Sequence, residues 1–198
     1  MKIINTRVYG LDESLIRSGY PMQTEIADIC DAIREADWPK VNKRYVRLGS
    51  APSGSGHDKF LRGIIVQADI IAPRYFWQEW DTYHFCESIS SQSTMHCAGK
   101  FKVVNMGNKY VDEDMIYRLQ VHIDKYIENP TVENLLIVKS NWLEGIELGR
   151  GISTNYNTLK TMHNQRKNHK LPEWNTVFEG WLKSLPLVTN LGVIEEDE

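Results

Sequence analysis

Apolar residues along this chain follow two spacings, one typical of strands and one typical of helices. Alternation and a high content of Ile and Val predict a strand over residues 2–9, closed by Gly10. A continuous aliphatic run between Gly63 and Pro73 predicts a strand over residues 64–72 that is buried on both faces. Two further strands are expected, a short one over residues 45–48 and a longer one over residues 147–156.

Three-to-four-residue spacing predicts helices between and after these strands. The first is capped by Thr24, carries Ile26, Ile29, Cys30 and Ile33 on one face and ends before Trp38. The second begins at Pro73 and continues through Phe76, Trp80 and Tyr83 to Cys86, with Phe76 and Trp80 in the core. Four more helices are expected over residues 112–127, 131–138, 158–165 and 172–185.

Strands and helices that alternate without regular βαβ units favour an α+β fold. The 198 residues suit a single domain over residues 1–198 with a core of its own. The acidic end of the chain predicts a disordered tail over residues 191–198.

Composition and charge exclude several classes of protein. Hydrophobic residues make up 41% and charged residues 25% of the chain, as in ordinary soluble globular proteins. A formal net charge of −3 argues against broad nucleic-acid binding. The N-terminal residues lack the apolar core of a signal peptide, and no run is long enough to span a membrane. We therefore expect a cytoplasmic protein without a membrane partner.

The segment from Gly56 to Cys97 concentrates the side chains that could perform chemistry. His84, Cys86, His96 and Cys97 are possible zinc ligands, but two lie on an expected helix and two are adjacent, unlike the paired knuckles of structural zinc sites. No GxSxG elbow or protease-type cysteine context is present. We expect no metal site, and we expect Cys86 and Cys97 to be free thiols without a catalytic role.

Phosphate binding suits the remaining polar residues better. Hydroxyl groups cluster in residues 88–94, imidazoles are present at His57, His84 and His96, and a second polar stretch contains Arg166. Hydroxyls and a guanidinium complement phosphate oxygens, and amide side chains can bind a base edge. This chemistry alone does not select one ligand.

The same residues resemble the flavin-dependent thymidylate synthases (ThyX). Gly56-His57, the apolar strand, Pro73, Trp80 and the Ser/Gln-rich loop follow the order of the family's GHxSxxEH segment and RHRxxSxNExSxRY signature. The segment NYNTLKTMHNQR, over residues 155–166, resembles the family's NxRSLxxFLxLR. The phrases SSQSTMH and QRKNHxLPEW are similar to those of ThyX-like proteins from phages and prophages, which would place the chain in a host cytoplasm.

The signature is degenerate in this chain. Thr82, Tyr83 and His84 stand where the family has Arg-His-Arg, so two cationic flavin contacts are missing. Thr94 and Met95 stand where the family has an Arg-Tyr pair, whose Arg binds the nucleotide phosphate. Each lost charge-assisted contact would weaken binding by about 1.5–3 kcal/mol.

The resemblance implies a ThyX-like fold, mainly an antiparallel sheet flanked by long helices, with FAD as cofactor and dUMP as substrate. It assigns cofactor contacts to His57, Tyr83, His84 and Asn155, and substrate contacts to Ser91, Gln92, Ser93, His96, Asn157 and Arg166. No catalytic residue is assigned.

Three functions are consistent with this pattern. The first is flavin-dependent methyl or one-carbon transfer to a pyrimidine nucleotide such as dUMP. The second is a catalytically inactive protein that sequesters or senses a nucleotide, and the third is an interaction protein with structural polar loops. The resemblance also implies a homotetramer whose site is assembled from more than one chain. The six tryptophans and nine tyrosines favour such interfaces.

Overall fold

The computed structural model describes residues 1–195, which form two compact units. Unit 1 contains Met1–Ile4, Asp69–Tyr83 and Ser88–Ile152, and unit 2 contains Asn5–Ala68, His84–Glu87 and Ser153–Glu198. Each unit is therefore built from three separate stretches of chain. No single position in the sequence divides the predicted domain into these two units.

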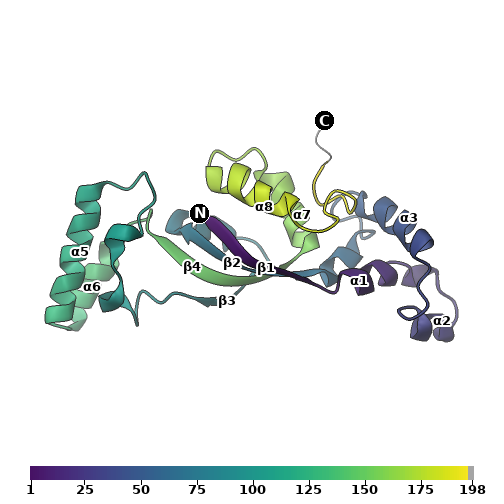
Figure 1. Ribbon diagram of the computed structural model, residues 1–198, viewed down its shortest axis with the longest axis horizontal. Coiled ribbons are helices and arrows are strands. Elements are labelled where there is room, and N and C mark those ends of the chain that lie inside the picture. The colour runs from purple at the N-terminus through teal and green to yellow at the C-terminus, as the bar shows by residue number, and fades with distance from the viewer. Residues whose placement is uncertain (196–198) are drawn as a thin grey trace. The chain divides into compact units, whose positions relative to one another are not determined.

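The elements alternate as the sequence predicts for an α+β protein (Figure 1). Four strands, β1 (Lys2–Tyr9), β2 (Ile65–Pro73), β3 (Glu87–Ser91) and β4 (Glu147–Asn155), form an antiparallel sheet in the order β1-β2-β4-β3. The helices are α1 (Leu11–Arg17), α2 (Ile26–Asp31), α3 (Trp38–Gly49), α4 (Arg74–Trp80), α5 (Glu113–Glu128), α6 (Val132–Ser140), α7 (Tyr156–Arg166) and α8 (Glu179–Lys183). Short 3₁₀ turns cover Tyr20–Met22, Lys59–Gly63, Ala98–Lys100 and Val103–Asn105, and a π-helical segment covers Glu173–Phe178.

Several predicted elements are confirmed. β1, β2 and β4 lie within a residue or two of their predicted ranges. In β2, fully buried residues alternate with half-buried ones, so the prediction that both faces are buried is wrong for one of them. Asp112 caps α5 and Thr131 caps α6 through side-chain oxygens that accept backbone N–H groups of the first helical turn. Among residues 1–195 no helix combines the length and the apolar character needed to cross a membrane.

The region between residues 24 and 49 differs from the prediction. The N-cap of α2 is Glu25 rather than Thr24, and the apolar face that contains Ile26 and Ile29 is exposed. The predicted strand over residues 45–48 is wrong, because these residues belong to α3. This helix begins after Asp37, whose carboxylate accepts a hydrogen bond from Lys40 N, and it buries Val41 and Tyr45 four residues apart.

The aromatic helix is shorter than predicted. α4 ends at Trp80 rather than Cys86, and Phe85 has a positive φ of 61°, a backbone conformation that a helix does not contain. Residues 87–91, predicted as loop, form strand β3, whose side chains are all exposed. Phe76 and Trp80 are buried as predicted.

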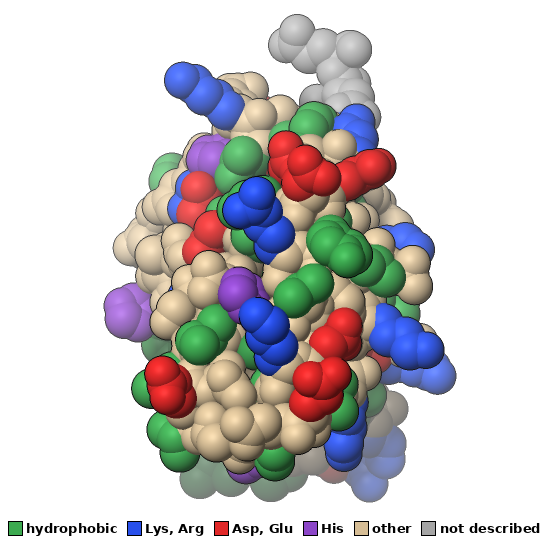
Figure 2. Space-filling view, turned by 90° about the vertical axis from the view of Figure 1, so that its left-hand side faces the viewer, with side chains coloured by type: hydrophobic (Ala, Val, Ile, Leu, Met, Phe, Trp, Pro, Cys, Tyr) green, Lys and Arg blue, Asp and Glu red, His purple; other side chains and the backbone are tan. Residues whose placement is uncertain are grey.

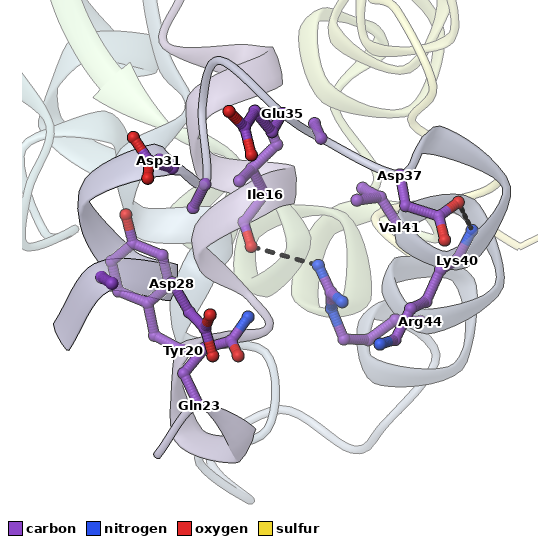
Figure 3. A pocket seen from close by; sticks show the side chains of 13 residues that line it. Ile16, Tyr20, Gln23, Asp28, Asp31, Glu35, Asp37, Lys40, Val41 and Arg44 are labelled. Carbon is purple, nitrogen blue, oxygen red and sulfur yellow. Dashed lines mark hydrogen bonds between the residues drawn. The ribbon is translucent and has the colours of Figure 1, made fainter. Parts of the chain in front are cut away.

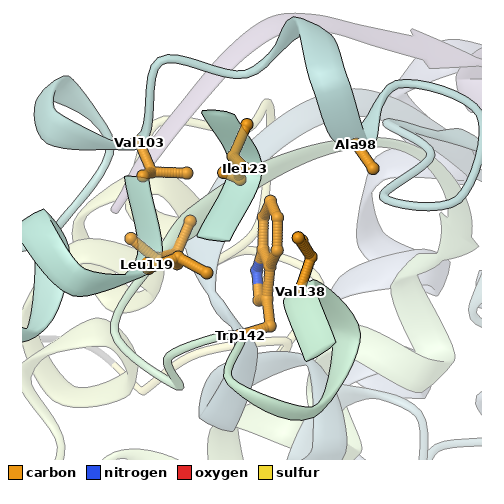
Figure 4. Close-up of a cluster of buried hydrophobic side chains, with 7 residues drawn as sticks. Ala98, Val103, Leu119, Ile123, Val138 and Trp142 are labelled. Carbon is orange, nitrogen blue, oxygen red and sulfur yellow. The ribbon is translucent and has the colours of Figure 1, made fainter. Parts of the chain in front are cut away.

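Unit 1 has its own hydrophobic core beside α5 and α6, which pack against each other (Figure 1). Leu119 and Ile123 of α5 face Val138 and Trp142, and Ala98, Val103 and Ile146 complete the cluster (Figure 4). The ring of Phe101 meets that of Trp142 edge to face at 5.5 Å.

Unit 2 packs α7 and α8 together with the C-terminal residues. Trp174 and Phe178 are fully buried and their ring centroids lie 5.2 Å apart. Leu191, Val193 and Ile194 are also buried, so the tail predicted from residue 191 is corrected for residues 191–195, because these apolar side chains pack into the unit. Residues 196–198 of that predicted tail lie outside the described residues.

Five of the six tryptophans are buried, which corrects one premise of the oligomer prediction. Only Trp38 is substantially exposed, at 39%. The tryptophans therefore serve the core of each unit.

Candidate functional site

Helix α7 carries three of the residues assigned to a ligand. Asn155, the last residue of β4, caps the helix, because its Oδ1 accepts a hydrogen bond of 3.0 Å from Thr158 N. Asn157 is half-buried in the first turn, and Arg166 is the last helical residue. At about 1.5 Å per residue, Asn155 and Arg166 lie roughly 16 Å apart along the helix axis. The side chain of Asn155 is buried, whereas that of Arg166 is half-buried.

Arg166 is held at the end of α7 by an aromatic ring. Its guanidinium carbon lies 5.1 Å from the ring centroid of Trp174, which is fully buried. A guanidinium over an indole face is attracted by the ring quadrupole and loses little freedom when it binds an anion. This placement gives unit 2 a half-buried, oriented cation.

The inward face of α7 contains two buried polar pairs that the sequence analysis missed. Lys160 Nζ donates to the carbonyl oxygens of Gly49 and Ala51, both at 2.7 Å, and lies 3.6 Å from Asp58 Oδ2. His163 Nδ1 lies 2.7 Å from Glu179 Oε2. Helical periodicity does reveal these positions, because Lys160 and His163 follow the buried Tyr156 and Leu159 at helical spacing. Burial also raises the pKa of Tyr156, whose hydroxyl donates to Pro186 O at 2.7 Å.

His57 lies in the loop that precedes the 3₁₀ turn Lys59–Gly63. Its imidazole is exposed and lines a cavity of about 490 Å³ that also involves α3. Gly56, immediately before it, has a positive φ of 82°, a conformation that glycine adopts at no steric cost. The loop therefore presents an accessible imidazole at a cavity in unit 2.

The three residues in place of the Arg-His-Arg motif provide few donors. Thr82 Oγ1 donates to Glu79 O at 2.7 Å, so that proton is already used within the chain. Tyr83 is half-buried, and His84 is exposed. Cys86, two residues on, donates from Sγ to Thr154 Oγ1 at 3.2 Å. No arginine or lysine occurs in this short segment.

The polar loop after β3 holds itself in place through its side chains. Gln92 Oε1 accepts a hydrogen bond of 2.8 Å from Gly149 N, while Gln92 N donates to Gly149 O at 3.0 Å. Ser93 Oγ accepts from the backbone N–H groups of Met95 and His96, at 3.3 and 3.1 Å. Ser91 and His96 are exposed. The loop is thus fixed against β4, with two acceptor oxygens already occupied.

The assigned residues divide between the two units. Unit 1 contains Tyr83, Ser91, Gln92, Ser93 and His96. Unit 2 contains His57, His84, Asn155, Asn157 and Arg166.

Arg150 of β4 is another cation that the sequence analysis missed. Its guanidinium carbon lies 4.2 Å from the ring centroid of Trp77, and its Nη1 donates to both carboxylate oxygens of Asp81 at 2.8 and 3.1 Å. Trp77, Asp81 and Arg150 lie too far apart in the sequence for a short motif to reveal this group.

A second cavity in unit 2, of about 400 Å³, lies among α1, α2 and α3 (Figure 3). Asp28, Asp31 and Glu35 lie on one side of it, and Lys40 and Arg44 on the other. The guanidinium of Arg44 reaches across from α3 toward Ile16 O, to which it donates. Across residues 1–195 no group of three or more His, Cys, Asp or Glu side chains could hold a metal ion.

No protein-family model and no curated protein matches this chain. Solved structures do. Flavin-dependent thymidylate synthase ThyX from Helicobacter pylori, crystallised with FAD and dUMP, gives a TM-score of 0.67 at 14% identity, with 98% of each chain covered.

The chain has the ThyX-like fold.

A second crystal structure of H. pylori ThyX with FAD and dUMP gives a TM-score of 0.67 at 15% identity, covering 98% of this chain and 97% of that one. The UMP/dUMP methylase PolB from Streptomyces cacaoi, bound to 5-Br dUMP, gives 0.62 at 12% identity, covering 98% and 96%. The ThyX-like fold predicted from the sequence is therefore confirmed, including its mixture of helices and antiparallel sheet.

Proposed function

We propose that this chain binds a pyrimidine nucleotide such as dUMP, with Arg166 as a principal cationic contact. The observation that carries the proposal is the likeness over nearly the whole chain to proteins crystallised with dUMP or 5-Br dUMP. The oriented guanidinium of Arg166 over Trp174 supports it, since a planar fork of N–H donors complements a phosphate or a pyrimidine carbonyl.

The loop of unit 1 is proposed to supply the contacts that select the nucleotide. The side-chain nitrogen of Gln92 and the hydroxyl proton of Ser93 remain available to donate to a ligand. The hydrogen bonds that fix these two side chains use only their acceptor oxygens. Ser91 and His96 add an exposed hydroxyl and an exposed imidazole. Asn157 is proposed as a further substrate contact from α7.

Flavin-dependent methyl or one-carbon transfer is the enzymatic form of this proposal. FAD would contact His57, Tyr83, His84 and Asn155. Thr82, Tyr83 and His84 do not fit a flavin diphosphate by themselves, because they contain no guanidinium or ammonium group and Thr82 donates its proton to Glu79 O. This observation favours a second candidate, a protein that binds the nucleotide without transferring a carbon unit.

Purification separates the two candidates. A yellow protein that releases flavin on denaturation would support the enzyme. A colourless protein whose Tm rises with dUMP would support sequestration or sensing, since a ligand that binds only the native state raises stability. A Tm unchanged by dUMP, UMP and FAD would contradict both.

Replacing Arg166 with alanine should weaken dUMP binding by about 2 kcal/mol, roughly thirtyfold in Kd, because a charge-assisted contact is lost. Isothermal titration calorimetry measures the change directly. Lys170→Ala is the matched control, since Lys170 is an exposed cation four residues further on. Equal affinities for native protein and Arg166→Ala would remove Arg166 from the site.

We also propose that the chain assembles as a homotetramer that completes the site. Helix α6 carries apolar side chains on its outer side, where Val132 is 74% and Leu136 57% exposed. Figure 2 faces the part of unit 1 that holds α5 and α6, where hydrophobic side chains lie among charged ones. Exposed apolar surface with a polar surround is typical of subunit contacts.

Light scattering should then give a mass of four times the 22.9 kDa chain. Val132→Glu together with Leu136→Glu should lower it toward one chain, because two buried carboxylates would oppose the contact. Ser91→Ala, outside α6, should leave the mass unchanged. A native mass of one chain would contradict the assembly.

A further inference from the structure

The cavity beside His57 has charge of only one sign. Its lining contains the cations Arg44 and Arg47 of α3 together with His57, and no carboxylate. Pro21, Met22 and Leu48 provide an apolar wall. A cavity of about 490 Å³ that combines cations with an apolar wall suits an anion that carries a flat organic group.

Arg44 is positioned by the chain before any ligand binds. Its Nε donates to Ser18 Oγ at 3.0 Å, and its Nη2 donates to Leu15 O and Ile16 O at 3.4 and 3.1 Å (Figure 3 shows the contact with Ile16). These bonds leave Nη1 with no hydrogen-bond partner among the described residues. Partial burial lowers the pKa of Arg44, and no carboxylate of residues 1–195 forms an ion pair with it.

Gly19 makes room for this guanidinium. A Cβ atom at position 19 would lie 2.6 Å from Arg44 Cζ and 2.7 Å from Nη1, which is closer than real atoms approach. The planar group therefore rests directly on the glycine backbone. The absence of a side chain here allows the guanidinium to adopt its fixed orientation.

Arg47 adds a second cation on the same side of α3. It follows Arg44 by three residues, so the two side chains lie on one helix face. Arg47 is exposed and forms no hydrogen bond or ion pair within the described chain. The other cavity that Arg44 lines is acidic, with the carboxylates of Asp28, Asp31, Glu35 and Asp37.

We infer that Arg44, Arg47 and His57 form a phosphate-binding pocket for the phosphate group of a nucleotide or dinucleotide ligand. The inference rests on the proposed nucleotide-binding function. This pocket supplies a ligand phosphate with the cations that the Thr82-Tyr83-His84 segment lacks. The guanidinium of Arg44, held by the chain, and the exposed guanidinium of Arg47 bind the oxygens, while Met22 and Leu48 contact the organic part.

Binding measurements with phosphorylated and unphosphorylated probes test the pocket. FAD and riboflavin are compared by flavin fluorescence, and dUMP and deoxyuridine by calorimetry, at constant ionic strength. Arg47→Gln should weaken FAD or dUMP binding about tenfold or more and leave riboflavin and deoxyuridine unchanged. If Arg47→Gln weakens the binding of FAD alone, the ligand of the pocket is a dinucleotide. If it weakens the binding of dUMP alone, the ligand is a nucleoside monophosphate.

Lys43→Gln is the matched control, because Lys43 is an exposed cation of the same helix and lines none of the described cavities. It should bind every probe as the native protein does. Arg44→Gln is measured alongside, with its Tm recorded because it also loses three internal hydrogen bonds.

The outcomes separate the inference from the proposed function. If the native protein binds FAD or dUMP and Arg47→Gln binds as tightly, the pocket is wrong and the proposed function stands. Equal loss for phosphorylated and unphosphorylated probes also overturns the pocket. A native protein that binds none of the four probes overturns both.

Discussion

Replacing Lys160 with methionine should lower the free energy of unfolding by about 3–5 kcal/mol, the largest loss expected from any change described for this chain. Lys160 is 5% exposed and Asp58 only 2%. Without the ammonium group, the carboxylate of Asp58 would remain buried and uncompensated, and the carbonyls of Gly49 and Ala51 would lose their donor. Urea unfolding followed by circular dichroism measures the change, and Tm should fall by roughly 10 °C.

Lys167→Met provides the matched control. Lys167 follows α7 directly and pairs with Glu195, whose side chain is 72% exposed. An exposed ion pair contributes about 0–1 kcal/mol, so this variant should unfold nearly as the native protein does. Asp58→Asn combined with Lys160→Met should recover part of the loss, because the buried charge is then removed. A Lys160→Met variant as stable as Lys167→Met would show that Asp58 does not need its partner.

The second large effect is expected where two glycines bring α3 against the C-terminal residues. A Cβ atom on Gly49 would overlap the carbonyl oxygen of Leu191, and one on Gly192 would lie 2.7 Å from Gly49 O. Gly192 also has a positive φ of 59°. Gly192→Ala should therefore cost about 2–4 kcal/mol, from backbone strain and from overpacking together.

Gly180→Ala gives the opposite result in the same unit. Gly180 lies in α8, and apart from its chain neighbours and the backbone of its own helix no atom lies within 4 Å of where its Cβ would be. Alanine should stabilise this helix by up to about 1 kcal/mol, since it has the higher helix propensity. Thermal unfolding of Gly49→Ala, Gly192→Ala and Gly180→Ala compares the three sites. Similar Tm values for all three would contradict the close backbone approach.

The sequence predicts those elements whose own residues determine them. α5 and α6 have capping residues and apolar periodicity in the same place, and both are found as predicted. β3 could not be predicted, because its exposed side chains show no apolar alternation and its backbone is fixed by pairing with β4. The helix expected to continue to Cys86 ends earlier, because aromatic spacing alone does not reveal the positive φ of Phe85.

The same distinction between local residues and distant partners applies to the candidate site. The positions of Asn155 and Arg166 at the two ends of α7 could be expected, because the sequence predicts a helix over residues 158–165 between them. The roles of Gln92 and Ser93 in holding their loop could not, because each depends on a backbone partner fixed by the sheet or the turn. Arg44 was also missed, since its orientation depends on Gly19, 25 positions earlier in the sequence.

The burial of the C-terminal residues has a consequence for biosynthesis. Val188, Leu191 and Val193 are packed inside unit 2, and Gly192 closes against the end of α3. Domains usually fold as they emerge from the ribosome, N-terminal parts first. Unit 2 begins at Asn5 yet needs residues up to 194 for its core. Its earlier segments must therefore wait, with their apolar surfaces accessible to chaperones, until residue 194 has left the ribosomal exit tunnel.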